Sequence, residues 1–152
     1  MSYKFVLDTY ALVEYATGTE MGRVVKEALD HGQCITPSIV IAELASKYCR
    51  ENRSQEWEPM LRFLKAKTRV LPLDASLASK SGIQKVSLRK RVKDISLVDS
   101  IVYQVAIDSG ARLVTGDEHF ETIPDVVYLK HVEKARSLVY ALIKGENGPS
   151  RS

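Results

Sequence analysis

The 152 residues of this chain contain no long hydrophobic run. No apolar stretch approaches the roughly 18 residues that a transmembrane helix needs, and charged Lys4 and Asp8 stand where a signal peptide would have its apolar core. The two cysteines, Cys34 and Cys49, lack CxxC spacing, and their separation in the predicted elements favours free thiols over a disulfide. We therefore expect a cytoplasmic protein with no membrane partner.

Motifs of several enzyme classes are also missing. The sequence contains neither of the glycine-rich nucleotide-binding patterns, GxxxxGK[ST] and GxGxxG, and no GxSxG nucleophile elbow. The three histidines, His31, His119 and His131, are far apart in the sequence and form no HExxH pair, which disfavours zinc. A phosphatase of the haloacid dehalogenase type would carry a second Asp two residues after Asp8, where Tyr10 stands. A response-regulator receiver would carry several acids near the first strand.

What is present is an ordinary globular composition, with 45% hydrophobic and 27% charged residues. The length fits one domain, which we place at residues 1–144, followed by a flexible tail at 145–152. The net charge of +3 permits a polyanionic partner without requiring one.

Short apolar runs alternate with amphipathic stretches along the chain. We expect Thr36 to cap the third helix, with Pro37 in its first turn, and Ser96 and Gly110 to delimit the sixth. The alternation of short apolar runs with amphipathic stretches predicts a three-layer α/β/α sandwich around a mainly parallel sheet of about five strands. The expected strands are 3–8, 34–36, 70–73, 112–115 and 126–129, and the expected helices are 9–16, 19–30, 37–50, 54–67, 75–88, 97–109 and 130–143.

Four carboxylates stand in or directly after apolar stretches, namely Asp8, Glu43, Asp99 and Asp117. An ionised carboxylate is costly to bury unless a cation compensates it. Asp8 and Asp117 follow predicted strands, and ligands of parallel sheets bind at the carboxyl ends of the strands. The four acids are therefore expected to converge on one rim of the sheet as a divalent metal site.

Each acid also has a purely structural explanation. Asp8 could cap the helix that begins at Thr9, and Asp117 could cap a short turn at 118–121. Glu43 could pair with Lys47 one turn away, and Asp99 has the spacing of a capping box with Ser96. The structural reading needs four separate explanations where a metal site needs one.

A metal site in which every ligand atom is an oxygen, as four carboxylates would provide, favours Mg²⁺ or Mn²⁺ over zinc or copper. Sites of this kind commonly serve phosphate chemistry. The hydroxyls of Thr9, Ser96 and Thr115 accompany the acids and could position water bound to the metal.

A basic cluster precedes the Asp99 helix and comprises Lys85, Arg89, Lys90, Arg91 and Lys93. It could be a solvated helix end, where cations are favoured. The alternative is a surface that contacts the phosphate backbone of a nucleic acid beside the acids.

Three segments in this order resemble the PIN-domain ribonucleases, and most closely the VapC-type toxins of type II toxin–antitoxin pairs. They are FVLDTYALVEY, TPSIVIAELASKY and SLVDSIVYQVAIDSGARLVTGDEHF. The resemblance covers about residues 3–130 and makes 1–144 a single PIN-like nuclease domain.

The resemblance implies that Asp8, Glu43, Asp99 and Asp117 occupy the four acidic positions of the family and that Thr115 occupies its hydroxyl position. Gly116 departs from the toxin pattern at a position where the family varies.

We therefore expect an endoribonuclease that uses Mg²⁺ or Mn²⁺ and produces 5′-phosphate and 3′-hydroxyl ends. The resemblance also implies an RNA substrate, a cognate antitoxin and a homodimer, for which we expect an interface at the early helices with Tyr3, Tyr10, Tyr15 and Tyr48. The alternatives are a housekeeping PIN nuclease that processes ribosomal RNA, a module that binds RNA without cutting it, and a phosphatase for small substrates.

Overall fold

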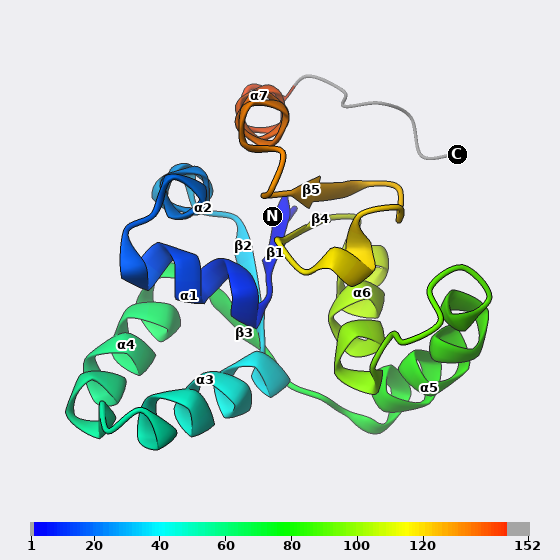
Figure 1. Cartoon of the computed structure of the whole chain (residues 1–152), viewed down its shortest axis with the longest axis horizontal. Coiled ribbons are helices and arrows are strands. Elements are labelled where there is room, and N and C mark those ends of the chain that lie inside the picture. The colour runs from blue at the N-terminus through cyan, green and yellow to red at the C-terminus, as the bar shows by residue number, and fades with distance from the viewer. Residues whose placement is uncertain (1, 146–152) are drawn as a thin grey trace.

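The computed structural model describes residues 2–145. These residues form five strands, seven α-helices and one 3₁₀ helix (Figure 1). The strands are β1 (Phe5–Leu7), β2 (Cys34–Pro37), β3 (Arg69–Leu71), β4 (Arg112–Thr115) and β5 (Val126–Tyr128). The helices are α1 (Thr9–Thr17), α2 (Glu20–His31), α3 (Ser38–Arg50), α4 (Ser54–Lys67), α5 (Ala75–Arg89), α6 (Leu97–Ser109), η1 (Glu118–Phe120) and α7 (Val132–Ile143).

All strand pairs are parallel, and the strand order is β3-β2-β1-β4-β5. β1 is fully buried at the centre, because Phe5, Val6 and Leu7 expose nothing to solvent. The chain adds β2 and β3 on one side of β1 and then crosses to add β4 and β5 on the other. The point where the order switches therefore lies between β1 and β4. The fold class predicted from the sequence is confirmed.

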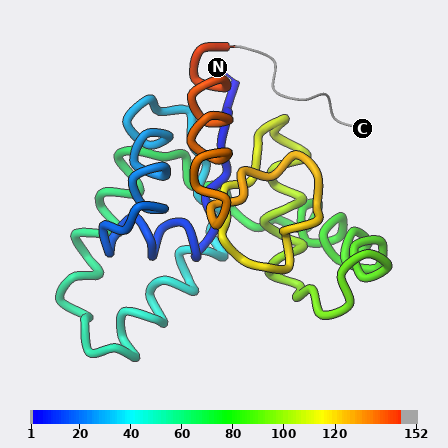
Figure 2. Tube along the Cα trace, turned by 45° about the horizontal axis from the view of Figure 1, so that its top comes forward, coloured from blue at the N-terminus to red at the C-terminus, as the bar shows by residue number. Residues whose placement is uncertain are grey.

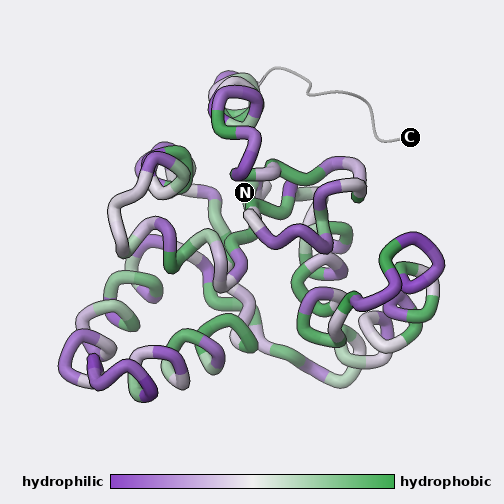
Figure 3. The backbone as a smooth tube through the Cα atoms, in the orientation of Figure 1, coloured by the Kyte–Doolittle hydropathy of each residue, from purple (hydrophilic) through white to green (hydrophobic). Residues whose placement is uncertain are grey.

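Helices cover both faces of the sheet. α5 packs against α6 on one side, and α1, α2 and α7 pack together on the other (Figure 1). α2 and α7 lie side by side although they are far apart in the sequence (Figure 2). Hydrophobic residues concentrate in the strands and on the inner helix faces, as the green segments of Figure 3 show. The helices do not cover the edge of the sheet where β1 and β4 end, and the predicted metal site is at this edge.

One glycine sets the distance between α1 and α2. A Cβ at Gly22 would lie 2.1 Å from the carbonyl oxygen of Glu14, so no larger residue fits there without moving a helix. Gly110 has φ +63° and ends α6, as the sequence predicts.

The predicted cap at Thr36 is wrong. Its hydroxyl is buried and hydrogen-bonds the hydroxyl of Thr68 at 2.8 Å, while Pro37 continues β2 opposite Leu71. Helix α3 therefore begins at Ser38 without a side-chain cap. β3 ends before Pro72, which has no N–H to continue the ladder.

The tyrosines expected at an interface mostly serve the interior. Tyr48 is only 5% exposed and packs against Trp57, so its assignment to an interface is wrong. Tyr15 stacks on Phe63 with ring centroids 5.4 Å apart. Cys34 and Cys49 are free thiols, the first buried and the second exposed. The expected tail lies, from residue 146 on, outside the described residues.

Candidate metal centre

The carboxyl ends of β1 and β4 lie next to each other. Leu7 pairs with Val114, and the Asp8 N–H points to the Val114 carbonyl oxygen at 3.5 Å. Asp8 follows β1 directly, and Asp117 follows β4 after one intervening residue. The switch in strand order thus brings together two acids that are more than a hundred positions apart in the sequence.

Asp8 is buried, with 7% of its surface exposed. It is the N-cap of α1, and its Oδ1 accepts a hydrogen bond from the Ala11 N–H at 2.9 Å. The Thr115 hydroxyl is a second hydrogen-bond partner of Asp8. Thr115 also accepts the Asp117 N–H at 3.0 Å, so this one buried hydroxyl links both acids.

Asp99 stands at the first turn of α6. The Ser96 N–H donates to its carboxylate at 3.1 Å, and its own N–H donates to the Ser96 hydroxyl at 3.0 Å. The capping box expected from the sequence is therefore real. The capping box holds the Asp99 carboxylate in a fixed orientation at the start of α6.

Asp117 caps the short helix η1. Its Oδ1 accepts the His119 N–H at 2.9 Å and lies 2.7 Å from the His119 Nδ1. The same Nδ1 lies 4.0 Å from the Asp99 carboxylate. His119 therefore stands between two acids that belong to different elements.

Glu43 lies on the second turn of α3 and makes no pair with Lys47, which instead binds Glu51 at 3.0 Å. The Thr9 hydroxyl donates to the Glu43 carboxylate at 2.5 Å. This bond joins α1 to α3 and fixes the carboxylate beside Asp8.

All four acids line one cavity of about 120 Å³. Its lining residues are Asp8, Thr9, Tyr10, Glu43, Val98, Asp99, Val102 and Asp117. The carboxylates come from the start of α1, from α3, from the start of α6 and from the turn after β4. Their convergence is thus a property of the fold, while their chemical roles stay a prediction.

A family model described as "PIN domain" matches residues 5–126 of the chain. The chain belongs to the PIN domain family. No curated protein sequence matches it significantly.

Several solved structures share the fold of this PIN domain. A toxin–antitoxin complex from Klebsiella pneumoniae is 23% identical with a TM-score of 0.62, and the match covers 83% of this chain and 98% of that one. A DNA-bound VapBC from Salmonella typhimurium is 21% identical with a TM-score of 0.65, over 82% and 95% of the two chains. VapC20 from Mycobacterium tuberculosis, described as a sarcin–ricin loop cleaving toxin, is 18% identical with a TM-score of 0.63, over 81% and 97%. The predicted resemblance in fold to VapC-type proteins is confirmed.

The electrostatics of the PIN-domain site suit a cation. Burial raises the pKa of Asp8 to about 7, and the charges of Asp117 and Asp99 add to this effect against the hydrogen bonds from Thr115 and Ala11. Burial also raises the pKa of Asp99, with a further contribution from Asp117. A divalent ion would relieve both the burial penalty and the repulsion between the acids.

The donor set fits such an ion. Ligand atoms of Asp99, Asp117 and His119 all lie within 4.8 Å of one another, and Asp8 faces the same cavity. Carboxylate oxygens are the preferred ligands of Mg²⁺ and Mn²⁺. The residues present can therefore hold the divalent metal that PIN nucleases use.

His119 lies beside Asp99 and Asp117, and the sequence analysis does not single it out as a candidate. No two histidines are close in the sequence, so their mutual spacing does not indicate a metal site. The useful signal was the spacing of His119 two residues after Asp117, inside the turn that follows β4. The hydrogen bond with Asp117 raises the pKa of His119.

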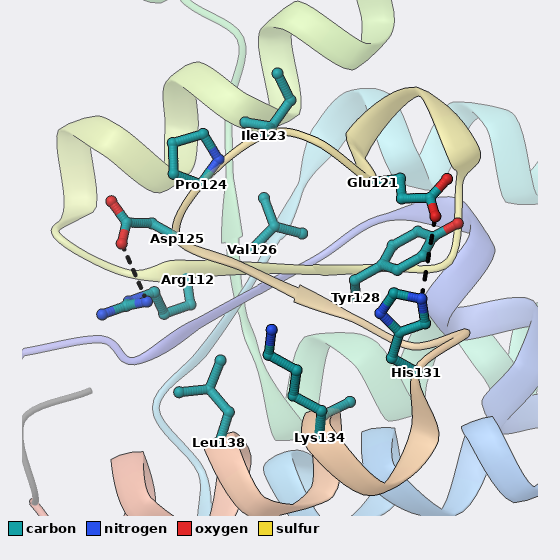
Figure 4. A pocket seen from close by; sticks show the side chains of 11 residues that line it. Arg112, Glu121, Ile123, Pro124, Asp125, Val126, Tyr128, His131, Lys134 and Leu138 are labelled. Carbon is teal, nitrogen blue, oxygen red and sulfur yellow. Dashed lines mark ion pairs between the residues drawn. The ribbon is translucent and has the colours of Figure 1, made fainter. Parts of the chain in front are cut away.

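A larger cavity, of about 240 Å³, lies between β5, the loop before it and α7 (Figure 4). Its charged side chains face each other: Arg112 binds Asp125 at 3.2 Å, and His131 lies 4.0 Å from Glu121. These pairs tie the loop to its neighbours, and the four acids lie outside this cavity. Among residues 2–145, no helix has the length and apolarity to cross a membrane.

Proposed function

We propose that this PIN domain is an endoribonuclease that depends on Mg²⁺ or Mn²⁺ and acts as the toxin of a toxin–antitoxin pair. The observation that carries the proposal is the convergence of Asp8, Glu43, Asp99 and Asp117 on one small cavity at the switch in strand order. Four separate structural roles would not require these acids to share one cavity.

The contacts of the four acids suggest the role that each of them has in the proposed reaction. Asp8, Asp99 and Asp117 would hold the metal, because their carboxylates are positioned by caps and by the Thr115 hydroxyl. When bound, the ion supplies positive charge that screens the phosphodiester, stabilises the leaving oxygen and activates water. Glu43 would orient the attacking water and accept its proton, with Thr9 holding the carboxylate in place. Cleavage by this route leaves 5′-phosphate and 3′-hydroxyl ends.

The basic cluster is the proposed contact for the RNA backbone. Arg89, Lys90, Arg91 and Lys93 are exposed, and no member of the cluster has a salt-bridge partner within residues 2–145. Arg89 ends α5, and the loop between α5 and α6 that carries the other three is strongly hydrophilic (Figure 3). Arg91 donates to the Thr122 carbonyl oxygen at 3.5 Å, so the loop lies against the segment that follows Asp117 and His119. A polyanion held there would extend towards the acids.

The partners are proposed from the relatives. The structures from Klebsiella pneumoniae, Salmonella typhimurium and Haemophilus influenzae are toxin–antitoxin or VapBC assemblies, which supports a cognate antitoxin for this chain. An antitoxin that presents a cation to the four acids would compete with the metal and silence the site. We also propose a homodimer, as the resemblance to VapC-type toxins implies.

Cleavage of a structured RNA by the purified chain tests the activity. We expect cutting with Mn²⁺ or Mg²⁺, none with a chelator, and none for Asp8→Asn. Asp74→Asn is the matched control, because Asp74 caps α5 through the Leu77 N–H at 2.8 Å much as Asp8 caps α1, but lies outside the cavity.

The outcomes separate the alternatives. RNA that binds but stays intact with every metal would identify a non-cleaving binding module. Growth arrest on expression of the chain, relieved by the product of a small adjacent reading frame, is expected for a toxin. Cleavage without growth arrest would favour a housekeeping nuclease.

A further inference from the structure

We propose that His119 provides a nitrogen ligand to the metal site and thereby makes this PIN domain prefer Mn²⁺ over Mg²⁺. This inference rests on the metal site of the proposed function, and it concerns which ion that site selects.

The first support is the spacing of the ligand atoms. The His119 Nδ1 lies 2.7 Å from Asp117 Oδ1 and 4.0 Å from Asp99 Oδ2. Ligands held at about 2.1 Å in octahedral geometry lie about 3.0 Å apart when adjacent and about 4.2 Å apart when opposite. The two observed distances are close to these values. Little movement would therefore let one ion contact all three side chains.

The second support is that the turn carrying His119 is fixed. The next residue, Phe120, is fully buried and packs near Tyr103, with ring centroids 6.3 Å apart. On the other side, Glu118 binds Lys130 at 2.9 Å. The His119 N–H is itself bound by Asp117. The backbone thus presents the imidazole to the two acids as part of the fold.

The third support is the composition of the site. Mg²⁺ strongly prefers oxygen ligands, whereas first-row transition ions also accept imidazole nitrogen. One imidazole added to the carboxylates of Asp8, Asp99 and Asp117 shifts the preference towards the transition ion. His119 is 39% exposed, so the site is open to solvent on this side for entry of the ion.

The competing explanation is that His119 only positions Asp117. In that role the protonated Nδ1 donates a hydrogen bond to the Asp117 carboxylate, and the imidazole ring does not contact the metal. Both explanations predict that a substitution at His119 impairs cleavage, so activity cannot separate them. Spectroscopic detection of a nitrogen atom bound to the metal does separate the two explanations.

The experiment uses Mn²⁺ alone as the probe, bound to the full chain. Pulsed electron paramagnetic resonance should detect a histidine nitrogen coupled to Mn²⁺ in the wild type and in His131→Gln, and should lose this coupling in His119→Gln. His131 is the matched control, because it is also partly exposed but faces Glu121 and not the Asp99 and Asp117 carboxylates. Metal-free melting curves of both variants establish that they fold.

Calorimetric titrations supply the second readout. In His119→Gln we expect the affinity for Mn²⁺ to fall about tenfold or more, and the affinity for Mg²⁺ to stay within about threefold. A residue that only positions Asp117 would lower both affinities alike, so an equal loss for the two ions would overturn the role of His119 as a ligand. Mn²⁺ binding without nitrogen coupling in the wild type would overturn the role of His119 and leave the proposed nuclease intact. Failure of the wild type to bind either ion would overturn the metal site itself and the inference with it.

Discussion

Asp8→Asn should stabilise the metal-free protein at neutral pH while it abolishes cleavage. Asp8 is buried beside two other acids, so its ionised form is disfavoured in the folded chain. Asparagine keeps an oxygen that can accept the Ala11 N–H, and it is as good an N-cap as aspartate. The substitution thus removes a charge without removing the cap.

The magnitude follows from the pKa of Asp8, which is about 7 in the folded protein against an ordinary value of 3.8. Well below pH 3.8 the carboxyl is protonated in both states and costs nothing, and at pH 4 the cost is still small because the unfolded chain has only begun to ionise. As the pH rises, the unfolded chain ionises first, so the folded state loses stability until the pH exceeds about 7. At about 1.4 kcal/mol per pKa unit, the full penalty at pH 8 is on the order of 4 kcal/mol.

Urea unfolding in a chelator at pH 4 and pH 8 measures this effect. Asp8→Asn and wild type should have similar free energies of unfolding at pH 4, and the variant should be more stable at pH 8. Asp74→Asn should show no such gain, because Asp74 is an exposed cap. A difference between Asp8→Asn and wild type that is the same at both pH values would refute the reasoning. Added Mn²⁺ at pH 8 should stabilise the wild type and narrow the gap.

Four further outcomes are expected. Millimolar Mn²⁺ should raise the melting temperature of the wild type by mass action, and a flat titration would count against the site. Arg89→Glu with Arg91→Glu, in a cleavage-dead background, should lower RNA affinity and reduce the slope of log affinity against log salt by about 1.4; an unchanged slope would make the cluster a solvated helix end. Gly116→Ala should cost about 1–3 kcal/mol, because its Cβ would lie 2.2 Å from the Tyr10 ring, and should cost much less in a Tyr10→Ala background. Sedimentation should show a dimer, and a monomer at high concentration would contradict it.

The sequence predicted the layers of this fold well because apolar periodicity reports burial, and the buried strands are nearly continuous apolar runs. Phe5–Leu7 and Arg112–Thr115 were predicted within two residues of their ends. Element boundaries that depend on partners were less predictable. Nothing in the local sequence shows that the Thr36 hydroxyl faces Thr68 on the next strand, so the cap was assigned to the wrong residue.

The site was predictable where a single residue carried the signal. Carboxylates in apolar stretches are conspicuous, and all four line the cavity. The contacts between elements were not visible in the same way. Neither the bond from Thr9 to Glu43 nor the approach of His119 to Asp99 follows from local spacing, since each joins two elements that only the tertiary fold brings together. Gly116 stands at a position where the family varies, yet it is where the Tyr10 ring packs.

Three of the four acids also stabilise the start of a helix, since Asp8 caps α1, Asp99 closes the capping box of α6 and Asp117 caps η1. A lineage that no longer needed cleavage would still be selected for a capping side chain at these positions. At Asp8 and Asp117, the two N-caps, Asp, Asn or Ser would persist long after activity had gone. Glu43, in the second turn of α3, caps no helix, and its one structural contact is the bond from the Thr9 hydroxyl, so we expect it to be substituted first. Among descendants of this chain, Glu43 is therefore the position that would distinguish active copies from inactive ones.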